Sequence, residues 1–143
     1  MTYQERFAWI WTLSLTVLLG GYLVFVWLDP QAQASLDMAT RVAHLAIPLA
    51  ALGAIALGTF MAGWLRGEVG PRAARDERDR RIAQRATSVG YMVLMAGTIL
   101  VGCVLPFDRS GWELVYAALF FIGLAELVHH GMIIVSYRRG LRD

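Results

Sequence analysis

One carboxyl and two imidazole groups lie in the middle of the last long apolar stretch of the sequence. Glu126, His129 and His130 stand between residues 112 and 137, where most side chains are apolar. Ionisable groups inside a membrane span are costly and mark functional sites by default. His130 follows Glu126 by four residues, so both side chains share one helix face. We predict a buried polar pair that either binds a proton or only locks helices together.

Hydroxyl groups from the other apolar stretches should join this pair. If depth in the membrane is counted from the surface next to the arginine-rich segments, several threonines lie at the same depth as Glu126. The predicted polar cluster consists of Glu126, His130, His129, Thr12, Thr16, Thr59 and Thr98. In such a cluster Glu126 is either protonated at neutral pH or paired with a charged His130.

Metal chemistry fits these residues poorly. Glu126 and His129 have the Glu-x-x-His spacing of di-iron bundles, but those sites need more carboxylates and a second such motif. His44 lies near the opposite membrane surface, so it cannot share a haem with His129 within one chain. We predict no cofactor, with a haem held between two copies as the alternative. Cys103 is the single cysteine, which excludes an internal disulfide.

Four apolar stretches must position these groups. A bilayer core of about 30 Å needs about 20 helical residues, and the stretches 7–28, 42–65, 87–105 and 112–137 meet this length. The first is longer than the apolar part of a signal peptide, so we expect it to be retained. We predict an all-α integral membrane protein, with the whole chain forming a single domain of four antiparallel transmembrane helices.

Arginine indicates the direction of these helices. The 13 basic residues are all arginine, and they gather at the N-terminus, in the loop 66–86 and at the C-terminus. Arg41 and Arg109 are the two that fall on the other side. Because positive loops stay inside, we predict a protein of the bacterial inner membrane with both termini in the cytoplasm.

The loop before the third stretch is a candidate partner surface. It consists of Asp76, Glu77, Arg78, Asp79, Arg80, Arg81 and Arg85. Acid-before-base pairs four residues apart favour a helix here, and arginines near a membrane attract anionic headgroups. We predict contact with anionic lipids or a cytoplasmic protein. Nucleic-acid binding is not expected, because acids are interleaved and aromatic side chains for stacking are missing.

The run Asp76-Glu77-Arg78-Asp79-Arg80 just before a span resembles a family of small bacterial membrane proteins known as a domain of unknown function. That resemblance implies four spans, a basic C-terminus such as Arg138-Arg139, and a signalling or regulatory role. It implies no catalytic residues.

Small residues repeat every four positions in the second stretch and so share one helix face. They are Ala50, Ala54, Gly58 and Ala62. Such stripes allow close helix packing in lipid. We expect this one to pack within the chain, with a homodimer seam as the alternative. Further along, Ser110 and Glu113 form a capping box that predicts a tight hairpin between the last two spans.

No known catalytic motif appears in the sequence. It therefore favours a non-enzymatic accessory or regulatory membrane protein that acts through its arginine-rich loop and C-terminus. Two alternatives stay open: a small proton-coupled transporter that uses Glu126 and His130, and a haem-binding electron carrier.

Overall fold

The computed structural model describes residues 3–69, 77–109 and 111–139, with only the backbone of Arg78 and Arg139. It is all-helical and has four helical stretches long and apolar enough to cross a membrane. The predicted fold class, a four-helix membrane bundle, is thereby confirmed. Ser110, and with it the predicted capping box, lies outside the described residues.

The first half of the chain forms one helical hairpin. Its first arm comprises α1 (Tyr3–Leu15), the π-helical turn η1 (Thr16–Gly20) and α2 (Gly21–Leu28). The short α3 (Pro30–Ser35) then leads into α4 (Met38–Leu65). Asp29 and Asp37 cap the N-termini of α3 and α4, because each side chain accepts a backbone N–H three residues on.

The second half forms another hairpin. Its first arm begins with α5 (Glu77–Ile99) and continues through the π-helical turn η2 (Leu100–Val104) and the 3₁₀ turn η3 (Leu105–Phe107). The second arm is α6 (Trp112–Arg139). The continuous apolar helix from Asp79 to Phe107 extends the predicted stretch 87–105 toward its N-terminal side.

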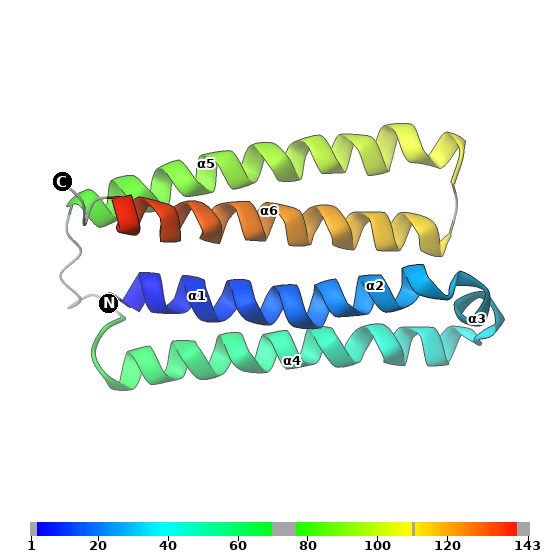
Figure 1. Cartoon of the computed structure of the whole chain (residues 1–143), viewed down its shortest axis with the longest axis horizontal. Helices are drawn as coiled ribbons and strands as arrows, with labels where there is room; N and C mark the ends of the chain where they lie inside the picture. The colour runs from blue at the N-terminus through cyan, green and yellow to red at the C-terminus, as the bar shows by residue number, and fades with distance from the viewer. Residues whose placement is uncertain (1–2, 70–76, 110, 140–143) are drawn as a thin grey trace.

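The helices lie side by side in one layer, in the order α4, α1–α2, α6, α5 (Figure 1). The closely packed pairs are α5 with α6, α6 with α1, and α1 and η1 with α4. α1 begins and α6 ends at the same end of the layer, which we call the arginine end; the other end is the α3 end (Figure 1). Thus α1 and α6 form the middle of the layer and α4 and α5 its two edges.

Two apolar clusters hold the layer together. Toward the arginine end, Ala8, Ala86, Ile133, Ile134 and Tyr137 join α1, α5 and α6. Further along, Leu15, Leu19 and Leu52 join α1, η1 and α4, and leucines of α6 pack against them. Both clusters include residues of α1, so this helix links the two hairpins.

Close helix contacts are made by glycines outside the predicted small-residue stripe. A Cβ at Gly97 would lie 2.5 Å from the Phe121 side chain, and one at Gly90 would lie 3.0 Å from Cβ of His129. The stripe residues of α4, in contrast, are all exposed: Ala50, Ala54, Gly58 and Ala62. The expectation that they pack within the chain is therefore wrong. In the described chain α4 is an edge helix, and α1 and η1 pack against a different face of it.

Candidate functional site

Glu126 lies about 20 Å from either end of α6, at 1.5 Å per residue. One hydrogen-bond donor and one imidazole nitrogen lie close to its carboxylate. The Trp11 indole N–H of α1 donates to Glu126 Oε2 at 2.9 Å, and His130 Nδ1 lies 3.4 Å from the same oxygen. We call Trp11, Glu126 and His130 the midspan site. It arises because α1 and α6 pack closely and because Glu126 and His130 are one helical turn apart.

The imidazole of His130 is held firmly in this site. Its Nδ1 lies 3.0 Å from the backbone oxygen of Glu126; since a carbonyl only accepts hydrogen bonds, this nitrogen is the donor. The rings of Phe7, Trp11 and His129 lie 5.8, 6.2 and 4.7 Å away between centroids. With a side chain only 10% exposed, His130 is enclosed by aromatic surface.

Glu126 is much more open than its histidine partner. Its side chain is 41% exposed, although the residue lies near the middle of a helix that can cross a membrane. A charged carboxylate there is costly in contact with lipid tails. The open side of Glu126 therefore requires a polar partner, such as water or another molecule.

The predicted threonines do not join the midspan site. The hydroxyls of Thr16, Thr59 and Thr98 all donate to carbonyl oxygens of their own helices, at 2.8 to 2.9 Å. The buried Thr12 hydroxyl has no hydrogen-bond partner among the described residues. Thus the structure brings together Glu126 and His130, with His129 beside them, and leaves the threonines apart.

Trp11 is the member of the site that sequence reasoning missed. A tryptophan near the end of a span is typical of the interfacial aromatic belt. The available signal was the four-residue spacing of Phe7 and Trp11, whose rings stack at 6.0 Å. This spacing marks one face of α1, but it does not show that α6 is the neighbour on that face.

The other candidate ligands do not assemble. α4 and α6 begin at the same end of the layer, and His44 lies six residues from the start of α4 whereas His129 lies seventeen from the start of α6. The two histidines therefore differ in depth by about 16 Å, too far for one haem within a chain. Within residues 3–69, 77–109 and 111–139, no three His, Cys, Asp or Glu side chains group as metal ligands.

The candidate partner surface has a distinct arrangement at the start of α5. Glu77 accepts a hydrogen bond from Arg81 at 2.6 Å, and both side chains are exposed. Asp79 points the other way and accepts from the buried Tyr137 hydroxyl at 2.6 Å. Arg80 and Arg85 are exposed. Asp76 and the side chain of Arg78 lie outside the described residues.

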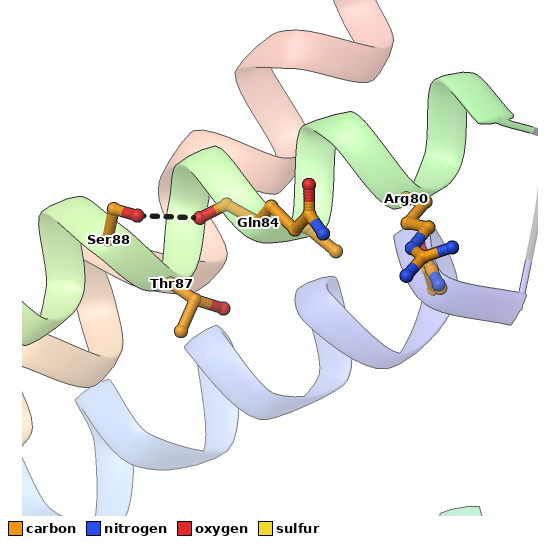
Figure 2. Close-up of a pocket in the computed structure, with 6 residues that line it drawn as sticks. Arg80, Gln84, Thr87 and Ser88 are labelled. Carbon is orange, nitrogen blue, oxygen red and sulfur yellow. Dashed lines mark hydrogen bonds between the residues drawn. The ribbon is translucent and has the colours of Figure 1, made fainter.

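A polar groove of about 860 Å³ lies beside this surface, between α5 and the start of α1 (Figure 2). Gln4, Arg80, Gln84, Thr87 and Ser88 supply its polar lining. The Ser88 hydroxyl donates to the Gln84 carbonyl at 3.1 Å. The groove thus carries the Arg80 guanidinium at one end and the Thr87 and Ser88 hydroxyls about two helical turns away along α5 (Figure 2).

Comparisons with protein-family models, curated proteins and solved structures give no match for this chain. The resemblance to a four-span family of unknown function stays a prediction. The two sites are therefore interpreted from their own geometry.

Proposed function

We propose that this protein is a non-enzymatic protein of the bacterial inner membrane, with its arginine end in the cytoplasm. Its role is accessory or regulatory, and it binds lipid phosphate groups at the arginine end. The observation that carries this proposal is the division of charge at the start of α5. Glu77 is bound by Arg81, and Asp79 by Tyr137. Arg80 and Arg85 are exposed and have no acidic partner in the described part of the chain.

The depth of these arginines favours lipid headgroups as their partner. A span of about 20 residues that ends at Phe107 begins near Ser88. Arg85 and Arg80 then lie about 5 and 12 Å outside the hydrocarbon core. Each arginine near an anionic surface contributes about 1 kcal/mol to binding.

The test compares two double variants: one is expected to weaken lipid binding, and the other is expected to leave lipid binding unchanged. R80Q/R85Q removes both of these exposed charges, whereas E77Q/R81Q removes the ion pair of Glu77 with Arg81 and leaves the net charge unchanged. Protein in mixed phosphatidylglycerol and phosphatidylcholine micelles is analysed by native mass spectrometry. We expect R80Q/R85Q to lower phosphatidylglycerol retention about tenfold or more and E77Q/R81Q to leave it near the wild-type level.

Two results would reject this assignment. Equal retention by all three proteins would show that these arginines do not select anionic lipid. If lipid retention is unchanged while a cytoplasmic protein crosslinks to wild type and not to R80Q/R85Q, the partner is that protein instead.

A second candidate function rests on the midspan site. Trp11 and His130 both approach a half-open carboxyl group near the middle of the membrane, and intramembrane carboxylates serve as proton sites in transporters. In liposomes with a pH-sensitive dye inside, Glu126→Gln is expected to abolish proton flux. Glu113→Gln, on the same helix but exposed at the α3 end, is the matched control. Full flux in Glu126→Gln removes this candidate.

The homodimer alternative gains support from the exposed stripe on α4. Exposed among the described residues, Ala50, Ala54, Gly58 and Ala62 offer a surface on which a second copy can pack closely. A dimer of this kind is compatible with both candidate functions.

A further inference from the structure

An apolar groove of about 940 Å³ opens at the α3 end, far from the arginine end and from the midspan site. Its walls are side chains of α2 and of the first turns of α6. The main apolar members are Leu23, Val24, Trp27, Tyr116, Ala117 and Phe120. Its volume is within the range of small-molecule sites, about 300 to 1,000 Å³.

The mouth of this groove carries charge of both signs. Arg41, Arg109 and Glu113 line it. Arg109 Nε lies 3.3 Å from a carboxylate oxygen of Asp108, and its Nη1 lies 3.3 Å from one of Glu113. Two carboxylates thus share the Arg109 guanidinium, and this side of the mouth has a surplus of negative charge.

Arg41 forms the positive side of the mouth. Its Nε donates to the Leu36 carbonyl at 3.1 Å, and its Nη2 donates to the Ala34 carbonyl. Both partners are neutral, and no acidic partner of Arg41 occurs within the described ranges. Its Nη1 is not engaged by these carbonyls and remains available for an oxyanion.

Gln33 is the third polar group of the groove. The residue is 5% exposed, and its carbonyl oxygen Oε1 is buried without a hydrogen-bond partner among the described residues. A buried acceptor without a donor is unfavourable. A ligand that supplies an N–H or O–H group here would remove this cost.

We propose that the groove binds a phospholipid whose headgroup carries a phosphate and a primary ammonium, as in phosphatidylethanolamine. The acyl chain lies along Val24, Ala117 and Phe120. The phosphate is bound by Arg41, and the ammonium donates to Gln33 Oε1 and faces the acidic side of the mouth. A mouth with two guanidiniums and two carboxylates favours this zwitterion over an anionic headgroup.

The test uses lipids that differ only in the headgroup. The full chain, purified in mild detergent, is offered phosphatidylethanolamine or phosphatidylcholine of the same chains, and bound lipid is counted by native mass spectrometry. Phosphatidylcholine keeps the phosphate but has no N–H donor. We expect about tenfold preference for phosphatidylethanolamine, the size of one hydrogen bond to a charged group. Equal retention overturns the headgroup assignment.

Two variants locate the effect. Gln33→Met removes the acceptor at similar size and is expected to abolish the preference while leaving phosphatidylcholine retention unchanged. Ala117→Phe fills the groove and is expected to reduce retention of both lipids; Ala96→Phe, at an exposed position of α5, is its control. A preference that survives Gln33→Met, or retention unaffected by Ala117→Phe, overturns the proposal.

A phosphatidylglycerol arm separates this site from the arginine end. It is run in R80Q/R85Q, so that the anionic lipid expected at the arginine end does not contribute. Stronger retention of phosphatidylglycerol than of phosphatidylethanolamine in this background overturns the zwitterion assignment, whatever the outcome for the proposed function.

Discussion

The indole N–H of Trp11 donates to the Glu126 carboxylate at 2.9 Å, between helices at opposite ends of the sequence. Indole is a donor only, and a carboxylate accepts from several directions. The pair is therefore a directional contact between α1 and α6, in a setting where apolar surface gives helices little reason to choose one neighbour over another.

Replacing Trp11 with Phe should destabilise the protein. The variant keeps most of the aromatic surface and removes the donor, and a typical hydrogen bond contributes about 0.5–1.5 kcal/mol to stability. We expect a loss of that size in the free energy of unfolding in mixed detergent micelles, followed by circular dichroism.

Trp9→Phe is the matched control for this change. The Trp9 Nε1 atom is buried but has no hydrogen-bond partner in the described part of the structure. Its ring faces Arg138, with the guanidinium carbon 5.0 Å from the ring centroid, and a phenyl ring retains much of that interaction. Equal losses in the two variants would show that ring size, and not the Glu126 contact, sets the stability.

Gly97→Ala should destabilise the α5–α6 hairpin. The added Cβ would lie 2.5 Å from the Phe121 side chain, and overpacking typically costs about 1–3 kcal/mol. Gly53→Ala on α4 is the control, because a Cβ there meets nothing within 4 Å and alanine favours helix by about 1 kcal/mol. Unfolding in mixed micelles distinguishes them, and a Gly97→Ala protein as stable as wild type would contradict this packing.

Larger side chains on the α4 stripe should reduce dimerisation without unfolding the chain. Ala54 and Gly58 are exposed in the single chain, so A54L/G58L is expected to leave the free energy of unfolding no lower than that of wild type and to lower the dimer fraction several-fold. The dimer fraction is measured by native mass spectrometry and by crosslinking in membranes with a reagent that does not require lysine side chains. An unchanged dimer, or a wild type that is monomeric, counts against the stripe as a seam.

Asp37 should give acid sensitivity to the start of α4. The Thr40 hydroxyl, followed by the Thr40 backbone N–H, lowers the pKa of Asp37 from its usual value. This stabilisation is complete above the unfolded pKa, about 3.9, and is lost as pH falls through the lowered folded pKa. Asp37→Asn still caps the helix but does not titrate. We expect the melting temperature of wild type relative to Asp37→Asn to fall as the pH drops below about 4.

Thr40→Ala checks the cause of that pH dependence. It removes the hydroxyl that contributes most to the lowered pKa of Asp37. In this variant the stabilisation by Asp37 should therefore be lost at a higher pH than in wild type. A transition that stays in place would assign the effect to another carboxyl group.

The helices were predictable from sequence, because hydropathy and length act within each segment. The four-residue spacing of Glu126 and His130 puts both side chains on one helix face, and their polar atoms lie 3.4 Å apart in the structure. Their partner across the interface was not predictable, since periodicity identifies a helix face but not the helix opposite it. Trp11 is therefore found only once α1 is seen beside α6.

The lateral order of helices was the least predictable feature. A stripe of small residues on α4 suggested packing within the chain, yet a small residue gives a close contact only where a neighbouring helix lies against its face. Gly97 has such a neighbour in Phe121, whereas the stripe has no partner in the described chain. Complementarity of this kind is a property of two segments and is not visible in either alone.

The single-layer arrangement has a consequence for how the protein assembles. The hairpin of α1–α2 and α4 and the hairpin of α5 and α6 meet mainly where α1 packs on α6 (Figure 1). A gene divided between the segments for α4 and α5 should therefore yield two fragments that recombine in the membrane. The Trp11–Glu126 hydrogen bond would then act as the recognition element between two separate polypeptides.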